Sequence, residues 1–267
     1  MGTVESAQNW RWAAFGKHPV AKDFFRIGPD LPLGKGFSDW VENGYQILTS
    51  KKEAFHGHCS WRFWARGSQR EGLACGLVRD SSDSLGRPYP LLMMGTGFLN
   101  GWEDHWDLLP FACERSWDQI EYFSSQRFDD FKKLEDEIQN IRPPLPNWPE
   151  LTTRREKLKE FDSTFDPKEG SWNLENFKRR ASILSEKAEV LIHLDQNPFH
   201  DQFTMISFWH LLFKSELKII PSALFMGGTL ESAFLAVFRR PLVATDFVQL
   251  WSVSTHWVKE NGSRTAG

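Results

Sequence analysis

Histidine, cysteine and aspartate residues that could bind a metal ion or move a proton gather at two places in the sequence. The first is the stretch HGHC, which contains His56, His58 and Cys59. Two histidines at positions i and i+2 of a strand share a face, so this pair could share a zinc ion. The sequence nominates no fourth ligand, and a polar connection between a helix and a strand explains the same residues.

The second cluster contains His193, Asp195, His200 and Asp201 and follows a predicted strand. An aspartate beside a histidine can orient the imidazole as a general base. No nucleophile stands beside the cluster, however, and a capped turn around Asn197 and Pro198 is the alternative interpretation.

Other catalytic motifs are missing from the sequence. It contains neither a G-x-x-x-x-G-K-[ST] nor a G-x-G-x-x-G phosphate-binding loop, and it has no G-x-S-x-G nucleophile elbow. We therefore predict no catalytic residue, no bound metal and no cofactor. A metal-dependent hydrolase that uses one of the two clusters is the alternative hypothesis.

Two polar loops are better suited to contacting another protein. Residues 16–24 combine charges, a proline and an aromatic side chain, and residues 81–87 form a loop rich in Ser, Asp and Gly between two predicted strands. Asp83 and Arg87 can pair and hold the second loop in shape. A loop held in this way on a rigid scaffold can also present a binding surface. The predicted contact residues are Lys17, His18, Asp23, Asp83 and Arg87.

Hydrophobic periodicity predicts the elements that must position these loops. In the first half we expect strands at residues 10–15, 61–65, 73–78 and 89–96, and an amphipathic helix over residues 37–48. A short helix over 102–109, a second helix from Pro110 and a third stripe over 128–141 follow. The prolines at 143, 144 and 146 end that stripe.

Residues 143–170 are rich in Pro, Thr and charges, which predicts a surface insertion or linker. A helix over 174–188, strands at 190–194, 205–213, 219–226 and 233–238, a helix from Thr245 and a disordered tail over 258–267 complete the chain. The predicted strands fall in two clusters along the chain and do not alternate one by one with helices, which argues against a doubly wound parallel sheet. We predict an α+β fold in one domain over residues 8–257, with a mainly antiparallel mixed central sheet covered by helices in an α/β/α-like arrangement.

The composition narrows the functional class. The 267 residues include 13 Trp and 22 Phe, and we expect most of the tryptophans in the core and some at a binding surface. A net charge of -3 argues against nucleic-acid binding. Carbohydrate binding through surface tryptophans is a third hypothesis, against which the lack of a signal peptide argues.

The cellular location follows from three sequence features. The three cysteines form no disulfide framework, no secretory leader is visible, and no apolar run is long enough to span a membrane. These features predict a cytoplasmic protein without stable membrane insertion.

The two polar loops carry a resemblance to a known family. The chain resembles the TagF family, also called ImpM, of type VI secretion accessory proteins, whose motifs are close to F-G-K-x-P-x-x-x-D-F and S-x-D-x-x-G-R-x-[FY]-P-L. The first motif stands here as Phe15, Gly16, Lys17, Pro19, Asp23 and Phe24, and the second as Ser81, Asp83, Gly86, Arg87, Tyr89, Pro90 and Leu91. A helical tryptophan, a W-R-F strand, a late S-x-W strand and a following P-S match Trp40, Trp61, Arg62, Phe63, Ser207, Trp209, Pro221 and Ser222.

The chain departs from the family pattern at two places. Arg79 and Asp80 stand where the family usually has Met-Pro, and Arg240-Pro241 replaces a common Leu-Pro. The resemblance implies a helix-covered mixed sheet and a cytoplasmic, non-enzymatic repressor of type VI secretion that acts after translation. It also implies a protein partner, the forkhead-associated scaffold called Fha.

Overall fold

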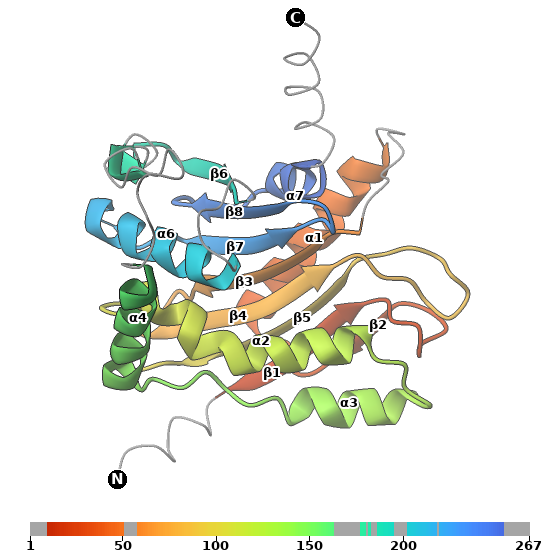
Figure 1. Cartoon of the computed structure of the whole chain (residues 1–267). Helices are drawn as coiled ribbons and strands as arrows, with labels where there is room; N and C mark the ends of the chain where they lie inside the picture. The colour runs from red at the N-terminus through yellow and green to blue at the C-terminus, as the bar shows by residue number, and fades with distance from the viewer. Residues whose placement is uncertain are drawn as a thin grey trace, which may run out of the picture.

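The fold is built on one antiparallel sheet of eight strands in the order β2-β1-β5-β4-β3-β7-β8-β6 (Figure 1). The computed structural model describes residues 10–50, 58–162, 177–179, 181–182, 186–194, 202–217 and 219–253. Its strands are β1 (Arg11–Gly16), β2 (Phe25–Ile27), β3 (Ser60–Arg66), β4 (Gly72–Arg79), β5 (Leu91–Phe98), β6 (Glu189–His193), β7 (Ala223–Gly228) and β8 (Ala233–Phe238). Every neighbouring pair is antiparallel, and the predicted fold class is confirmed.

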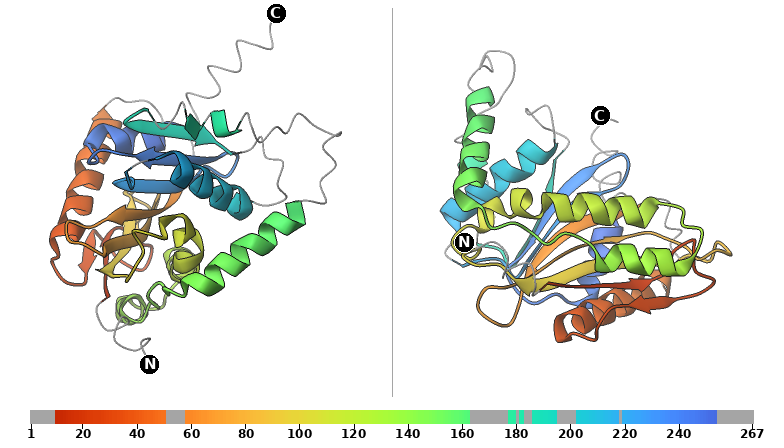
Figure 2. Two further views of the ribbon diagram at one scale, coloured as in Figure 1. Left: turned by 90° about the vertical axis from the view of Figure 1, so that its left-hand side faces the viewer. Right: turned by 90° about the horizontal axis from the view of Figure 1, so that it is seen from below.

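Helices cover both faces of the sheet and make three layers (Figure 2). One face packs against α1 (Pro32–Ser50) and α7 (Ala244–Trp251). The other packs against α2 (Leu109–Ser125), α3 (Phe131–Gln139), α6 (Gln202–Glu216) and the 3-10 turn η2 (Trp106–Leu108). No helix among these described residues has the length and apolarity needed to cross a membrane.

The sequence of β3 shows why both faces need cover. Trp61 and Phe63 belong to the core under α1 and α7, whereas Trp64 belongs to the core under α2 and α6. Successive side chains of a strand point to opposite faces, so a strand with large aromatic residues on both faces must be buried on both sides. All described tryptophans except Trp148 are buried, as the core interpretation predicted.

The contact between α1 and α7 joins distant parts of the chain. The indole Nε1 of Trp40 donates a hydrogen bond to the carbonyl of Val243 at 2.9 Å. A Cβ atom at Gly44 would lie 2.3 Å from Cβ of Phe247, so only glycine allows the two helices to approach this closely.

One strand prediction is wrong. Residues 205–213, which contain the S-x-W match of Ser207 and Trp209, lie within the helix α6. Its buried residues include Met205 and Trp209, while Ile206 and Phe208 pack half-buried against the same core. Because apolar side chains lie on several sides of this helix, its sequence lacks the alternation of apolar and polar residues that identifies an amphipathic helix. Its aromatic residues also favour the assignment of a strand.

Two further elements differ from the prediction or extend it. The three-residue strand β2 was not expected, and α4 (Trp148–Asp162) occupies part of the stretch predicted as a linker or insertion. The buried carboxylate of Asp107 binds Arg155 of α4 and Lys214 of α6, which attaches α4 to the body of the molecule. The predicted helix over 174–188 is described only in part: residues 177–179 and 181–182 are helical, whereas 174–176, 180 and 183–185 lie outside the described residues, as does the tail over 258–267.

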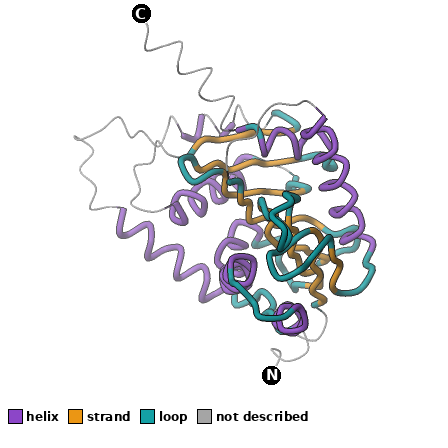
Figure 3. Tube along the Cα trace, turned by 90° about the vertical axis from the view of Figure 1, so that its right-hand side faces the viewer, coloured by secondary structure: helices purple, strands orange, loops and turns teal. Residues whose placement is uncertain are grey.

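The antiparallel register brings the two polar loops together. Gly16 at the end of β1 pairs with Leu91 at the start of β5, so the β1–β2 and β4–β5 loops leave the sheet at the same end. Figure 3 views the molecule from this end, with the loops in teal in front of the strand ends.

Candidate functional site

All five predicted contact residues lie in the two loops at this end of the sheet, and Asp83 is at the centre of their interactions. Its Oδ2 atom lies 3.0 Å from Nζ of Lys17 and 2.7 Å from Nε of Arg87. Its Oδ1 atom accepts hydrogen bonds from the backbone N–H groups of Leu85 and Arg87, both at 3.0 Å. We call Lys17, Asp83 and Arg87 the Asp83 cluster.

The carboxylate of Asp83 is ionised although its side chain is fully buried. Burial on its own raises the pKa of Asp83, but the hydrogen bonds from Lys17, Arg87 and the Leu85 backbone outweigh it and lower the pKa below its ordinary value of 3.8. A buried charge with two cationic partners and two backbone donors is fully satisfied. The Asp83 cluster therefore fixes the shape of the β4–β5 loop.

Arg87 connects that loop to the β1–β2 loop. Its Nη2 atom donates to the carbonyl of Lys22 at 2.7 Å and lies 3.3 Å from Oδ2 of Asp23. The backbone N–H of Ser84 donates to the carbonyl of Ala21 at 2.9 Å. These cross-links make the two loops one rigid unit, because each constrains the other through both side chains and backbone.

His18 belongs to the β1–β2 loop, but it is fully buried. Its Nδ1 atom accepts a hydrogen bond from the Val20 N–H, and its ring packs against Phe128. Burial lowers the pKa of His18, the Phe123 carbonyl opposes this effect, and the charge of Arg79 adds to it. The neutral imidazole is thus part of the interior, and the contact role predicted for His18 stays a prediction.

The exposed part of the site includes apolar residues that the sequence analysis did not select. Leu85 is 72% exposed and Phe24 is 43% exposed. The side chains of Asp23 and Arg87 are 69% and 49% exposed, whereas that of Lys17 is only 12% exposed. We call Asp23, Phe24, Leu85 and Arg87 the loop surface. The sequence feature that could have revealed this surface is Leu85, a single leucine in a loop that otherwise consists mainly of Ser, Asp and Gly.

Two tyrosines support the loop surface from behind. The ring of Tyr89 contacts Phe24 edge-on at 5.5 Å and Tyr45 of α1 at 4.9 Å between centroids. The hydroxyl of Tyr45 donates to the carbonyl of Pro88 at 3.2 Å. Burial, with Glu42 and Tyr45 nearby, raises the pKa of Tyr89 to about 12, so it stays neutral and packs as an apolar ring.

Comparison with known proteins finds a family model that matches the part of the chain containing the two loops. Residues 13–141, which hold both loops, match the family model described as "TagF N-terminal domain, Type VI secretion system-associated". Over residues 13–141, the chain is thus similar to TagF N-terminal domains. The crystal structure of PA0076 from Pseudomonas aeruginosa PAO1 aligns with 13% identity over 90% of this chain and 93% of that one, with a TM-score of 0.47. No curated protein matches the chain.

The departure from the TagF pattern at Arg79 and Asp80 has a structural role. Asp80 accepts hydrogen bonds from the Cys59 N–H and from the indole Nε1 of Trp251, both at 2.7 Å. Arg79 donates to the hydroxyls of Ser124 and Ser125 at the C-terminal end of α2. The two residues therefore attach the start of the β4–β5 loop to the helices on opposite faces of the sheet.

The first cluster of possible metal ligands is divided between described and undescribed residues. His56 lies outside the described part of the chain, and His58 is exposed. Burial, followed by the nearby charge of Asp80, raises the pKa of the Cys59 thiol, while Trp61 opposes the shift. A neutral thiol is a poor metal ligand and a poor nucleophile.

The second cluster is described only at His193, since Asp195, His200 and Asp201 lie outside the described residues. Within the described ranges, no three His, Cys, Asp or Glu residues come together as possible metal ligands. Trp148, the least buried tryptophan of the described chain, stacks one face of its ring on His105 and donates to the Asn100 carbonyl.

Proposed function

We propose that this type VI secretion-associated chain is a non-enzymatic repressor that binds a protein component of the secretion system through the loop surface. The carrying observation is the buried carboxylate of Asp83, whose cluster holds an exposed leucine, phenylalanine and arginine in a fixed arrangement. Ordering exposed loops on binding costs conformational entropy. A loop that is already rigid avoids that cost.

The family resemblance directs the proposal to a cytoplasmic partner, the Fha-type forkhead-associated scaffold. Binding would occupy the scaffold and withhold it from assembly of the apparatus. Leu85 would insert into an apolar recess of the partner, with Arg87 and Asp23 supplying charged contacts at the edge of the interface.

Isothermal titration of the purified scaffold with the full chain tests the proposal. We expect Leu85→Asp to weaken binding by about tenfold or more, because a charge then enters the apolar recess. Ile219→Asp is the matched control, since Ile219 is 60% exposed and lies outside the two loops. Leu85 and not Lys17 or Arg87 is changed, because both cations hold Asp83 and their loss would disturb the loop itself.

The possible failures have different meanings. Absence of binding by the wild-type chain would reject the scaffold as partner. Equal binding by wild type and Leu85→Asp would reject the loop surface as the contact site.

A further inference from the structure

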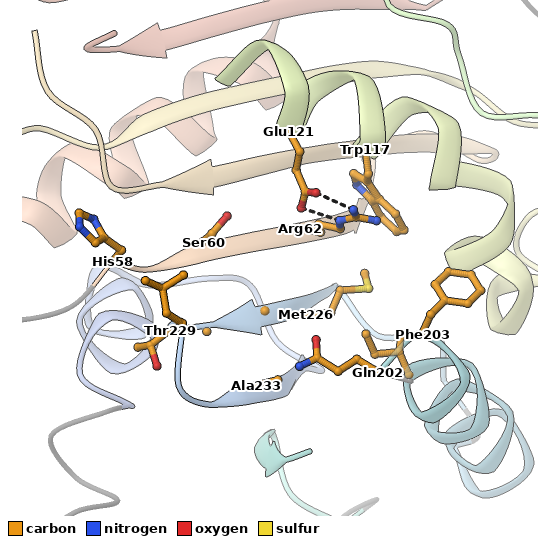
Figure 4. A pocket seen from close by; sticks show the side chains of 14 residues that line it. His58, Ser60, Arg62, Trp117, Glu121, Gln202, Phe203, Met226, Thr229 and Ala233 are labelled. Atoms are coloured by element: carbon orange, nitrogen blue, oxygen red, sulfur yellow. Dashed lines mark hydrogen bonds and ion pairs between the residues drawn. The ribbon is translucent and has the colours of Figure 1, made fainter. Parts of the chain in front are cut away.

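A cleft lies apart from the loop surface, on the face of the sheet that α2 and α6 cover. It has a volume of about 390 Å³ and opens between the two helices, over β3 and β7 (Figure 4). Trp117 of α2, Phe203 and Ile206 of α6 and Met226 of β7 supply apolar lining. Leu230, in the turn between β7 and β8, also borders the cleft and is 87% exposed. The cleft is therefore suited to a large apolar side chain.

The wall of the cleft beside α2 carries an excess of negative charge. Arg62 of β3 donates to both carboxylate oxygens of Glu121, at 2.7 and 2.6 Å, and lies 3.2 Å from Oδ1 of Asp118. One guanidinium thus faces two carboxylates, and the side chain of Asp118 is 60% exposed. An occupant with a cationic group matches this wall, whereas an acidic occupant does not.

The C-terminal end of α7 lies next to the rim of the cleft. The carbonyl oxygen of Trp251, the last residue of α7, is 4.0 Å from Sγ of Cys59. The preceding residue, His58, is exposed and lines the cleft. The described part of the chain ends two residues after Trp251, at the buried Val253. The residues that follow therefore leave the fold close to the cleft.

We propose that the occupant of the cleft is residues 254–259 of the same chain, with the indole of Trp257 in the apolar lining and Lys259 beside Asp118. We call these residues, Ser-Thr-His-Trp-Val-Lys, the tail segment. Trp257 stands four residues after Val253, a distance that an extended chain covers in about 13–14 Å. Stacked layers are roughly 10 Å apart, so this reach is enough to pass the end of β3 from the α7 face to the α2 face.

The covalent connection explains why a small cleft is sufficient. The cleft is lined by 14 residues, fewer than the roughly 20–30 per partner of a stable interface between separate proteins. A short flexible tether gives its segment an effective concentration in the millimolar range, so contacts too weak to hold a separate peptide still bind the tail segment. Exposed ion pairs contribute little, so the indole is the main anchor and Lys259 a secondary contact.

Methyl NMR of the full chain, labelled at its five methionines, tests the proposal because Met226 lines the cleft. An indole docked against Met226 shifts its methyl resonance through the ring current. We expect Trp257→Ser to move the Met226 resonance and to leave those of Met93 and Met94, on β5, unchanged. Arg264→Ser, which lies beyond the tail segment, is the matched control and should leave all of these resonances in place.

Engineered thiols give a second measurement that keeps Trp257 intact. Gln202 is exposed and lines the cleft, whereas the three native cysteines are buried. In a chain carrying Gln202→Cys and Val258→Cys, mild oxidation with glutathione disulfide should form an intramolecular disulfide. The control pair is Leu85→Cys with Val258→Cys, because the β4–β5 loop leaves the sheet at the same end as His58. We expect the first pair to form its disulfide at least about tenfold faster.

Either measurement can overturn the proposal. A Met226 resonance that is the same in the wild type and in Trp257→Ser would reject Trp257 as the anchor. Disulfide formation by the Gln202 pair no faster than by the control pair would reject the tail segment as the occupant. Leu85→Asp should leave the Met226 resonance unchanged, so this inference and the proposed function can fail separately.

Discussion

Asp80 and Asp83 stand three residues apart in the β4–β5 connection, and their environments shift their pKa values in opposite directions. Burial is the largest influence on each and favours the neutral acid. Asp80 receives its close hydrogen bonds from neutral donors, a backbone N–H and an indole, and its pKa is raised. Asp83 faces two cations, and its pKa is lowered. The sign of the shift is thus decided by the charge of the donors and not by burial alone.

The difference also separates two tasks within one loop. Asp80 attaches the loop to the core through Trp251 of α7, whereas Asp83 shapes the exposed tip that carries Leu85. Because the two carboxylates have different partners, substitutions can disturb one task and leave the other intact.

The largest expected effect is that of Asp83→Asn. The amide retains the shape of the side chain but leaves Lys17 and Arg87 without their shared anion. We expect the melting temperature to fall by roughly 5–10 °C and hydrogen exchange to accelerate in residues 17–24 and 81–88. Asp23→Asn, at an exposed carboxylate, is the control and should change the melting temperature by less than about 2 °C. A tip that stays protected in Asp83→Asn would refute the role of the cluster.

The second prediction concerns the pH dependence of stability, measured by urea unfolding from pH 3 to pH 7. Asp83 has a folded pKa below its ordinary value of 3.8, so its contribution is present above that pH and disappears as the pH falls below it. Asp80 has a raised folded pKa, so its contribution is present below 3.8 and disappears as the pH rises through the folded value.

Two variants isolate these opposite contributions. Relative to Asp83→Asn, the stability advantage of the wild-type chain should begin to shrink as the pH falls from about 4 toward 3, because its full loss requires a pH below the folded pKa of Asp83. Relative to Asp80→Asn, it should gain stability as the pH falls from 7 toward 4. If the two differences change in the same direction, the opposition between the two aspartates is wrong.

The smallest expected effect is that of Arg87→Lys. Lysine keeps the charge beside Asp83 but lacks the fork with which Arg87 also reaches the Lys22 carbonyl and Asp23. We expect a loss of roughly 1–3 °C in melting temperature, with faster exchange confined to the β1–β2 loop. Lys132→Arg, in an exposed ion pair on α3, should leave both measurements unchanged and serves as the control.

The sequence predicted the parts of the fold in which local pattern and tertiary packing agree. The strands around Trp61, Leu73 and Leu91 and the helix around Trp40 lie where their periodicity placed them. The helix α6 could not be found in the same way, because its apolar residues are not confined to one stripe.

The candidate site was predictable in location but not in the roles of its residues. The loop composition and the Asp83–Arg87 spacing selected two segments that the structure brings together; their role as a contact surface stays a prediction. Composition could not show that Asp83 and His18 are buried while Leu85 is exposed, because burial depends on how the two loops cross. The role of Asp80 likewise depends on Trp251, which lies 171 residues away in the chain.

The pairing of β3 with β7 has a consequence for biosynthesis. The region that matches the TagF model ends at residue 141, yet its central strand β3 obtains one of its two neighbours from residues 223–228. A nascent chain that has emerged only as far as α3 therefore presents an open strand edge beside uncovered aromatic rings, which is the surface that self-associates most readily. Completion of the sheet must wait until residues 223–228 have been synthesised and have left the ribosome.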